Sequence, residues 1–436
     1  MRHAVIIGAG VIGAASAVEA LAAGLRVTLV DPGPAGGEQA ASYGNAGWLS
    51  SHSIIPPSGP GMWKDIPGYL LDPLGPLAIR WRHLPRAAPW LLRHLAAAWT
   101  HERVRAIASA LRPLLRDAPQ LHLQLARRAG VAELISPSGV LHVYPSRAHF
   151  ESEAPSWRIR RELGVTWDEL DEQALRRREP ALDSRYRFAV RVNEAGRCHN
   201  PGRYVAALAA HARESGAAWI EAAANSLEIT GGRLRAVHLH DGRRIECDAA
   251  VIAAGVRSAA LAAQAGDRLP LAAERGYHAT LDLPGGPRET IMASDRKLVV
   301  NRMETGLRVA GQVEIAAIDA APDWGRAQIL RDHLLDMFPE LPRDIPQPPT
   351  RYWLGCRPSM PDGIPCIGHA SASADVIHAF GHGHVGLAGA ARTALWVARL
   401  LSGREEDAGL KACDPGRFGR RPMESHRPLP PRNASR

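Results

Sequence analysis

The sequence predicts an α/β fold in which a Rossmann-like domain with a β-meander carries a discontinuous α+β domain with an antiparallel sheet. Three observations indicate this fold. Residues 4–23 give a strand, a glycine-rich turn and a helix in that order. Glycine-containing turns at 231–232 and 241–242 separate alternating segments, as hairpin turns do, and lead to an apolar strand at 249–253. A long β-rich excursion, residues 269–312, then interrupts the first domain.

The N-terminal segment has the order of a βαβ unit that binds a dinucleotide. A short apolar strand runs into Gly8-x-Gly10-x-x-Gly13, an alanine-rich helix follows, and a second strand ends at Asp31. Gly8 allows the tight turn, Gly10 lets a pyrophosphate approach the backbone, and Gly13 lets helix and strand pack closely. Asp31 stands where it can accept hydrogen bonds from a ribose. This unit alone does not separate NAD from FAD.

A second glycine-rich loop, ASYGNAGWLS at 41–50, follows directly after the acidic residue. An isoalloxazine ring needs backbone donors along its edge, and a nicotinamide enzyme has little use for such a loop. The alternative is an ordinary surface loop. The loop therefore favours FAD over NAD.

The stretch AFGHGHVGLAG at 379–389 sets His382 and His384 between glycines, just before a segment with a helical pattern. It is consistent with a metal-binding pair, an acid/base pair, or a helix start that meets a large flat ligand. A metal site needs further ligands, and no acidic or thiol side chain lies nearby in sequence. We therefore expect no metal here, and the other two interpretations stay open at this point.

The charge of the chain does not indicate a nucleic-acid partner. The 436 residues carry a formal net charge of +9, but residues 414–436 alone hold six arginines against two acidic residues. This proline-rich end is expected to be disordered. No basic stripe interleaved with aromatic residues appears in the rest of the chain.

Cysteine usage and the start of the chain favour a cytoplasmic protein. The five cysteines are scattered, odd in number and without CxxC spacing, which argues against a disulfide framework and a structural zinc site. No apolar run is long enough to span a membrane, and a strand-like segment begins at His3, which leaves no room for a leader. We expect free thiols in a reducing compartment.

Several motifs together resemble the D-amino-acid oxidase superfamily of FAD enzymes, which includes D-amino-acid dehydrogenases and glycine and sarcosine oxidases. They are GAGVIG, VIAAG, GCRPSMPDGIPCIG and GHGHVGLAG. The nearest likeness is to the glyphosate-oxidoreductase and hydroxy-D-proline-dehydrogenase type, through SYGNAG, LLDPLGPLAIR, ERGYH, GLRVAG and FGHGH. The resemblance runs from about Val5 to about Gly403.

The resemblance implies FAD as the cofactor, with the GHGHVGLAG segment beneath the pyrimidine edge of the flavin. There the helix dipole stabilises negative charge on the reduced ring. Sarcosine oxidases of this family attach their flavin through a cysteine in the neighbourhood of Cys356, but the spacing to Asp362 does not match, so we expect non-covalent FAD. The implied cofactor-binding residues are Gly8, Ala9, Gly10, Val11, Ile12, Gly13, Asp31, Ser42, Gly44, Asn45, Ala46, Gly47, Ala254, Gly255, Gly381, His382, Gly383, His384, Gly386 and Leu387.

Arg357 matches the arginine that binds the substrate carboxylate in this family, a role that suits the planar guanidinium. The alternative is a plain ion pair between Arg357 and Asp362. In ERGYHATLDL, Tyr277 and His278 face opposite sides of a strand, one of which should roof the substrate pocket. Ordinary sheet positions are the alternative. The implied substrate-binding residues are Arg357, Tyr277, His278 and His382.

The resemblance thus predicts an oxidoreductase that oxidises the C–N bond of a D-amino acid or a cyclic imino acid by hydride transfer to FAD, without a dedicated base. Arg302 and Arg308 are the next candidates for the carboxylate anchor. One alternative is an oxidoreductase for N-substituted glycines such as glyphosate or sarcosine, and a more distant one is an RNA-associated flavoprotein. Oxygen, a quinone and an electron-transfer protein remain open as acceptors, as does a peripheral membrane contact through the tail or residues 62–81.

The helical pattern at 85–130 predicts two or three packed helices that cover another part of the molecule and carry no catalytic residues. The nucleotide-binding parts lie on both sides of the excursions. The predicted FAD-binding domain is 1–55, 196–265 and 350–405, the substrate domain is 56–195 and 266–349, and 406–436 is an Arg- and Pro-rich tail.

Overall fold

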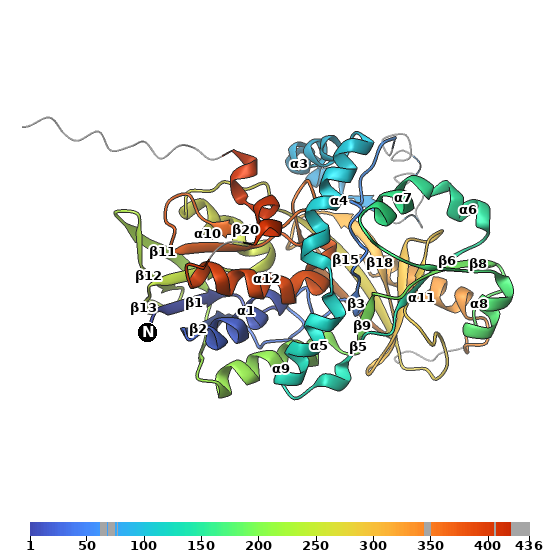
Figure 1. The fold of residues 1–436 in the computed structure, drawn as a ribbon, viewed down its shortest axis with the longest axis horizontal. Helices are drawn as coiled ribbons and strands as arrows, with labels where there is room; N and C mark the ends of the chain where they lie inside the picture. The colour runs from blue at the N-terminus through green and yellow to red at the C-terminus, as the bar shows by residue number, and fades with distance from the viewer. Residues whose placement is uncertain (62–67, 69–74, 76, 344–349, 405–406, 420–436) are drawn as a thin grey trace, which may run out of the picture.

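The computed structural model describes residues 1–61, 68, 75, 77–343, 350–404 and 407–419 (Figure 1). Two large sheets organise this part of the chain, a six-stranded one near the N-terminus and a nine-stranded one beside it. The predicted mixed α/β fold is confirmed.

The six-stranded sheet belongs to the Rossmann-like domain. Five of its strands are parallel and the sixth, β20, runs antiparallel to its neighbour. In spatial order the strands are β10 (Ala218–Glu221), β2 (Arg26–Asp31), β1 (His3–Ile7), β14 (Ala249–Ile252), β21 (Val376–Phe380) and β20 (Cys366–His369).

The two faces of this sheet pack against different elements, and residues 4–7 of β1 are all apolar because both faces of the strand are buried. Ala4 and Ile6 pack in one core cluster with the helices, whereas Val5 and Ile7 pack in another with the meander. The helices are α1 (Val11–Ala22), α9 (Pro201–Glu214) and α12 (Gly386–Leu401). The meander is β11 (Ala224–Thr230), β12 (Arg233–Leu239) and β13 (Arg244–Glu246), with α10 (Ser258–Gln264) beside it.

The nine-stranded sheet forms the second domain. Its neighbours are antiparallel except for two parallel pairs, β16 with β6 and β18 with β4. In spatial order the strands are β19 (Thr350–Ser359), β15 (Ala272–Leu281), β18 (Gly306–Ile315), β17 (Leu298–Met303), β16 (Ile291–Ala293), β6 (Val140–Tyr144), β8 (Phe188–Val192) and β7 (Asp168–Leu170), with β4 (Leu77–Ile79) beside β18.

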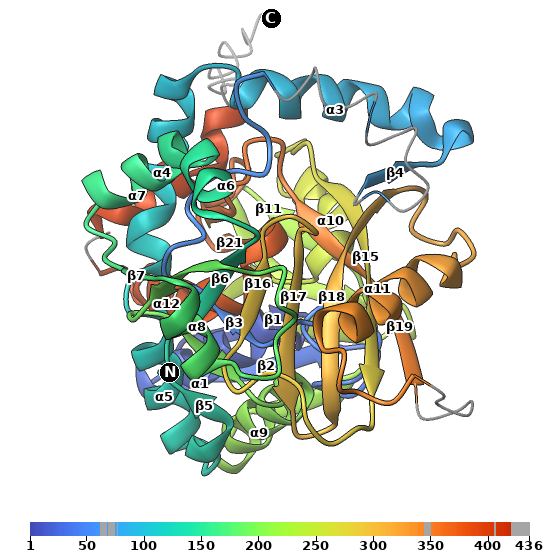
Figure 2. The same ribbon diagram turned by 90° about the vertical axis from the view of Figure 1, so that its right-hand side faces the viewer.

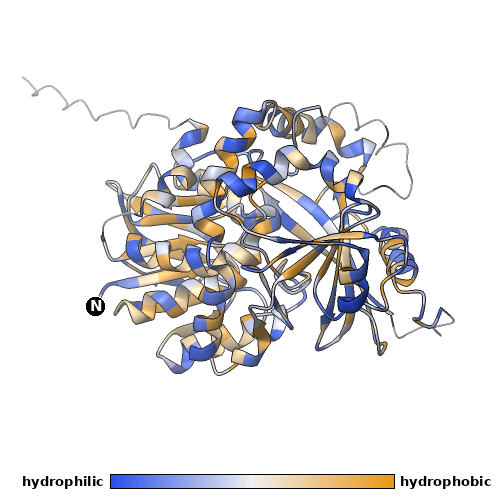
Figure 3. Cartoon of the chain, turned by 45° about the vertical axis from the view of Figure 1, so that its right-hand side comes forward, coloured by the Kyte–Doolittle hydropathy of each residue, from blue (hydrophilic) through white to orange (hydrophobic). Residues whose placement is uncertain are grey.

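Strand β19 changes one predicted domain boundary. It pairs with β15 along its whole length, so residues 350–359 group with the second domain and not with the FAD-binding segment predicted to start at 350. A small sheet of β3 (Trp48–Leu49), β9 (Gly196–Cys198) and β5 (Ile135–Ser136) lies beside α12 and α5. Figure 3 shows that apolar residues concentrate on the strands of the large sheets.

The predicted helical region contains α3 (Leu84–Ala97), α4 (His101–Leu115) and α5 (Ala118–Arg128). The latter two pack against α12 of the first domain, although the predicted boundaries placed residues 56–195 in the substrate domain. The second domain adds short helices and one longer helix, which lies in front of its sheet in Figure 2. These are α6 (Arg147–Ser152), α7 (Ala154–Glu162), α8 (Glu172–Arg178) and α11 (Trp324–Met337).

The expected disorder of the tail is wrong for residues 407–419. Two 3-10 helices, Ala408–Cys413 and Pro415–Phe418, pack onto the domain with Leu410 and Cys413 buried. Arg417 pairs with Asp362 at 2.8 Å. The overall basic, proline-rich composition masked these few anchoring side chains, and residues 420–436 lie outside the described residues.

In the part of the chain that the structure describes, no helix is long and apolar enough to cross a membrane. The same residues contain no cluster of three or more side chains that could hold a metal ion. The sequence analysis named residues 62–81 as one candidate for a peripheral membrane contact. Most of this segment lies outside the described residues.

Candidate active site

The glycine turn after β1 brings the turn, α1 and β14 into close contact. Gly8 has a φ of +103°, and a Cβ there would lie 2.4 Å from the Ala253 carbonyl oxygen. A Cβ on Gly13 would lie 1.8 Å from the Gly8 carbonyl oxygen. At Gly10, by contrast, a Cβ would meet only Ser42 Oγ, at 3.8 Å. The space beside Gly10 is therefore open, as the approach of a pyrophosphate requires.

Unpaired polar groups border this open space. Helix α1 starts after Gly10 with no side chain capping its first amides and no acidic residue in its first turn. Ser42 Oγ is buried and has no hydrogen-bond partner among the described residues. Free amides at a helix N-terminus and an unpaired buried hydroxyl are groups that a bound pyrophosphate would satisfy. The turn thus fits the phosphate end of a dinucleotide.

Asp31 holds the turn from the end of β2. Its Oδ2 accepts from the Ala9 amide at 2.7 Å, and its Oδ1 accepts from the Gly33 amide at 3.0 Å. Burial raises the pKa of Asp31 above its usual value, and these amide bonds act in the opposite direction. Asp31 therefore shapes the turn itself, and its contact with a ribose stays a prediction.

Arg308 on β18 holds the first part of the loop at 42–47. Its Nη1 donates to the carbonyl oxygens of Tyr43 at 3.0 Å and Asn45 at 2.9 Å, and its Nε donates to Thr280 Oγ1 at 3.3 Å. Burial lowers the pKa of Arg308 to about 10, so the side chain is still charged at neutral pH. Because its donors are engaged with the loop, Arg308 is a poorer candidate for a carboxylate anchor than we expected.

His278 and Asn301 hold the rest of the same loop. His278 Nδ1 donates to the Gly44 carbonyl oxygen at 3.0 Å, and Asn301 Nδ2 donates to the Ala46 carbonyl oxygen at 2.9 Å. Burial, helped by the charge of Arg308, lowers the pKa of His278 to about 3, so the ring is neutral. Four successive carbonyl groups are therefore bound by side chains of the second sheet, which fixes the loop between the two domains.

The histidine-glycine stretch turns sharply before α12. Gly381 has a φ of +86°, and a Cβ there would lie 2.6 Å from Met360 Cγ. His382 Nε2 lies 2.9 Å from Thr393 Oγ1, which itself donates to the Gly389 carbonyl oxygen, so His382 is the donor. Burial lowers the pKa of His382 to about 3. The neutral ring is directed toward α12, which fits a positional role better than the substrate contact we predicted.

His384 lies against a buried carboxylate that the sequence analysis did not single out. His384 Nε2 is 2.9 Å from Glu274 Oε2, which also accepts from Ser359 Oγ at 2.8 Å. Burial alone raises the pKa of Glu274, but the charge and hydrogen bond of His384 outweigh it and lower the value to about 2. Glu274 is therefore ionised at neutral pH and fixes the orientation of His384.

Strands β15 and β19 bring Arg357 to the same sheet face as Glu274. The two residues are direct cross-strand partners, and Gly276 stands two positions along β15. The Arg357 guanidinium lies over Gly276, where a Cβ would come within 2.2 Å of Nη1. The absence of a side chain at Gly276 therefore makes the room that Arg357 occupies.

Arg357 does not pair with Asp362, so the plain ion pair that we considered is wrong. Asp362 binds Arg417 instead, with Nε at 2.8 Å. Arg357 Nη1 donates only to the Gln312 carbonyl oxygen at 3.3 Å, and no ion pair to Arg357 occurs among the described residues. Burial lowers the pKa of Arg357, with Glu274 opposing that effect. A partly buried guanidinium without an acidic partner is suited to bind an anionic ligand.

Tyr277 lies on the opposite face of β15, away from Arg357 and His278. Its hydroxyl donates to Glu314 Oε2 at 2.8 Å and accepts from the Asp323 amide at 3.0 Å. The ring is 1% exposed and belongs to the core cluster of α11. The alternation that we predicted is present, but Tyr277 is on the core side, so the predicted substrate contact does not fit the structure.

A family of proteins described as FAD dependent oxidoreductase matches residues 3–400. The chain belongs to this family. The flavoenzyme is 59% identical over 418 residues to the D-amino-acid oxidase of Bradyrhizobium diazoefficiens, which covers 96% of this chain and 99% of the relative. It is 31% identical to the D-amino acid dehydrogenase of Dechloromonas aromatica, over 92% of this chain and 97% of the relative.

Solved structures agree on the fold of the flavoenzyme. Glycine oxidase from Bacillus cereus ATCC 14579 superposes with a TM-score of 0.71 at 18% identity, over 94% of this chain and 100% of that chain. The resemblance to the D-amino-acid oxidase superfamily is therefore confirmed, and FAD is the cofactor of the flavoenzyme.

Two further candidate residues of the flavoenzyme are Arg302 and Cys356. Arg302, the other alternative anchor, is exposed. Cys356 pairs in register with Arg275, on the face opposite Arg357, and burial raises the pKa of its thiol. Glu274 opens the ERGYH stretch but was not singled out there, and Asn301 stands in no motif, so only their hydrogen-bond partners reveal their roles.

Loosening the loop at 42–47 is expected to weaken FAD binding. Asn301→Ala removes the one hydrogen bond that this side chain makes to the loop, worth about 1 kcal/mol, which corresponds to a rise of about fivefold in the Kd for FAD. Arg308→Gln removes two bonds from a charged donor and should raise the Kd further. Quenching of flavin fluorescence in a titration measures both, with the exposed Asn225→Ala as a matched control. Unchanged FAD affinity in both loop variants would contradict this role.

Proposed function

We propose that the flavoenzyme oxidises the C–N bond of a D-amino acid or a cyclic imino acid. The observation that carries the proposal is Arg357, a partly buried cation that forms no ion pair among the described residues. A substrate carboxylate would supply the missing anion as a bidentate partner. The names of the relatives, D-amino-acid oxidase and D-amino acid dehydrogenase, support the same substrate class.

We propose that the FAD lies along the residues that the sequence analysis assigned to it. The free amides of α1 and the open space beside Gly10 suit the pyrophosphate. The loop at 42–47 and the start of α12 suit the ring, because both are fixed by contacts from other elements. FAD supplies the hydride-accepting chemistry when bound.

The protein residues then bind and orient the substrate. Arg357 holds the carboxylate, so that the α-carbon is presented with its hydrogen toward the flavin. The substrate carbon loses a hydride and the nitrogen loses a proton. The resulting imine reacts with water to give a keto acid and ammonia, or a single amino keto acid when the imine is cyclic. Glu274 is bound to His384 and Ser359, so its carboxylate is engaged by these two partners before the substrate enters.

A second candidate function is the oxidation of an N-substituted glycine such as sarcosine or glyphosate. It also requires a carboxylate anchor, and the likeness of the fold to glycine oxidase favours it as the alternative. A dye-linked assay with D-proline, hydroxy-D-proline, D-alanine, sarcosine and glyphosate separates the two. Turnover of sarcosine or glyphosate alone would replace the first proposal by the second.

We propose that FAD is bound without a covalent bond. The Cys356 thiol faces away from Arg357 and has a raised pKa, which disfavours the thiolate that a flavin linkage needs. Acid precipitation of the holoenzyme should therefore release the yellow colour into the supernatant. Colour that stays with the pellet would contradict non-covalent binding.

Replacing His382 or His384 with glutamine is expected to keep the acidic limb of the pH profile of kcat/KM. In this proposal that limb belongs to the substrate amine, which must be neutral before the hydride leaves. A required base would instead cost roughly 10²-fold in kcat when replaced. Profiles for a series of substrates with different amine pKa values check this. A limb that vanishes in one variant and ignores the substrate would make that histidine the base.

The compartment and the electron acceptor also belong to the proposal. All five cysteines are free, and four of them are buried, which supports a reducing compartment such as the cytoplasm. We propose a peripheral membrane contact as well, since a quinone acceptor would be met at a membrane. The rate at which oxygen, compared with a quinone analogue, reoxidises the substrate-reduced enzyme identifies the acceptor class.

A further inference from the structure

Helix α3 is held to the protein along one face. Trp90 Nε1 donates to the Ser359 carbonyl oxygen at 3.2 Å, and His94 Nδ1 donates to the Pro361 carbonyl oxygen at 2.9 Å. The two rings stack with centroids 4.9 Å apart, and Ala87 is buried beside them. Figure 2 shows α3 along the outer edge of the molecule. Its other face is therefore turned outward.

The outward face of α3 and its flanks is apolar. Of the six large hydrophobic side chains that are exposed in the described residues, three lie here: Trp81 at 67%, Leu92 at 68% and Trp99 at 55%. Steps of three and four residues return to the same helix face, so exposed positions at these steps form one stripe. The stripe consists of Trp81, Pro85, Pro89, Leu92, Ala96 and Trp99, all exposed. An apolar stripe of this kind on a surface helix requires an explanation beyond the fold.

Arginines flank the stripe. Arg82, Arg86 and Arg93 follow the same helical steps on the neighbouring side, are exposed and form no ion pair among the described residues. No acidic residue occurs between residues 77 and 101. We define the α3 surface as the apolar stripe with these three arginines. It is both apolar and strongly positive.

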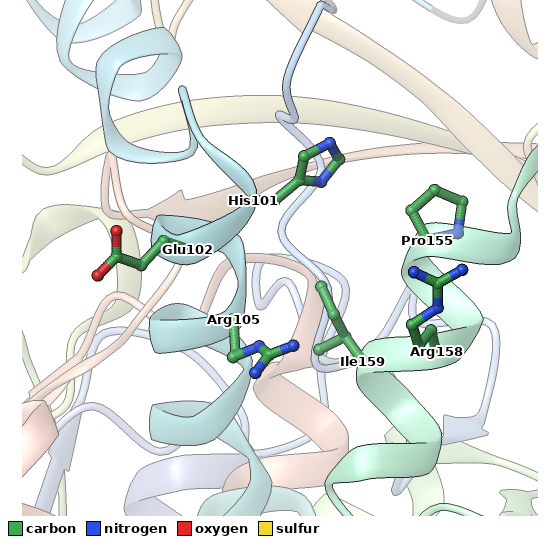
Figure 4. A pocket seen from close by; sticks show the side chains of 6 residues that line it. All are labelled: His101, Glu102, Arg105, Pro155, Arg158 and Ile159. Carbon is green, nitrogen blue, oxygen red and sulfur yellow. The ribbon is translucent and has the colours of Figure 1, made fainter.

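The positive charge continues beyond the end of α3. A hollow of about 500 Å³ lies between the start of α4 and α7, lined in part by His101, Arg105 and Arg158 (Figure 4). The Glu102 carboxylate points away from the other labelled side chains in this view. Arg105 is partly neutralised by Glu162 at 2.7 Å. The hollow extends the basic character of the α3 surface past Trp99.

We propose that the α3 surface docks this protein on an anionic lipid membrane. The charge decides the occupant, because a second copy would bring the same arginines together, whereas anionic headgroups neutralise them. Tryptophans at both ends of an apolar stripe suit the boundary between headgroups and acyl chains. Arginine side chains beside the stripe can reach the headgroups while their methylene groups stay in the apolar layer. The proposal does not depend on which substrate the enzyme oxidises.

The test is co-sedimentation of the full-length holoenzyme with vesicles of phosphatidylcholine alone and with about one third phosphatidylglycerol. Binding is expected only to the anionic vesicles and should weaken as salt is added. Each arginine near an anionic surface contributes about a factor of five, so Arg82→Gln, Arg86→Gln and Arg93→Gln together should weaken binding on the order of a hundredfold. Leu92→Glu should weaken it at least about tenfold.

Matched controls keep the test specific. Ile318→Glu changes another exposed apolar residue, and Arg116→Gln, Arg127→Gln and Arg177→Gln together remove three exposed charges elsewhere. These variants should bind as the wild type does, and every variant should retain its flavin absorbance. Absence of vesicle binding, equal binding to neutral vesicles, or equal losses in the controls would each overturn the proposal. If the wild type does not bind lipid and Leu92→Glu changes the molecular mass of the oxidised enzyme in solution, the surface serves self-association instead.

Discussion

Replacing Arg357 with alanine is expected to cost about 2 to 4 kcal/mol in kcat/KM for an amino acid substrate, while FAD stays bound. The reason is that the Arg357 guanidinium forms no ion pair within the described residues and is available to the substrate carboxylate, whereas alanine leaves its room over Gly276 empty. Arg357→Lys should recover only part of the loss, because lysine offers a point charge in place of a planar fork. Steady-state kinetics with a dye acceptor measure both variants.

A matched control for this result is Arg302→Ala, which removes an exposed arginine of the same sheet. Its kcat/KM should stay within about twofold of the wild type. Flavin absorbance of each variant separates substrate binding from cofactor loss. Unchanged kinetics in Arg357→Ala, with FAD retained, would move the carboxylate anchor to another residue.

Replacing Gly10 with valine is expected to remove FAD almost completely while the protein still folds. The nearest atom to a Cβ at Gly10 is Ser42 Oγ at 3.8 Å, so the side chain fits the protein but occupies the approach of the pyrophosphate. Gly13→Val differs, because its Cβ would collide with the Gly8 carbonyl oxygen at 1.8 Å and disturb the packing of α1. Absorbance and circular dichroism of both variants distinguish loss of cofactor from loss of fold.

The expected outcome is a colourless but folded Gly10→Val protein and a poorly folded Gly13→Val protein. A yellow Gly10→Val variant with wild-type FAD content would show that the pyrophosphate lies elsewhere. Equal unfolding of both variants would mean that Gly10 is required by the fold, not by the cofactor.

The nucleotide-binding turn could be predicted because its determinants are local. Gly8 adopts a positive φ, Gly13 packs against the Gly8 carbonyl oxygen, and Asp31 follows at the end of the next strand, although the close approach of Gly8 to Ala253 joins distant parts of the chain. The residues that hold the loop at 42–47 could not be found in this way. Arg308 Nη1 and the Tyr43 carbonyl oxygen are separated by 265 positions in sequence, so their contact exists only after the sheets pair.

The alternation of residues along β15 predicted which side chains share a face of the strand. It did not predict which elements pack against each face. Whether Tyr277 or His278 faces the site depends on which side α11 covers, and nothing in the strand itself states that. The partner of Asp362 illustrates the same limit. Arg357 is five positions away in sequence, yet the carboxylate binds Arg417, which is 55 positions away in the tail.

The central claim is tested most directly by anaerobic reduction of the enzyme-bound flavin with the two enantiomers of one amino acid. The account predicts that D-proline or D-alanine bleaches the flavin absorbance rapidly and that the L-enantiomer, at the same concentration, does so far more slowly or not at all. Arg357→Ala should bleach only at much higher D-amino acid concentrations. Bleaching by the L-enantiomer alone, or by neither enantiomer while sarcosine reduces the flavin, would contradict the proposed function.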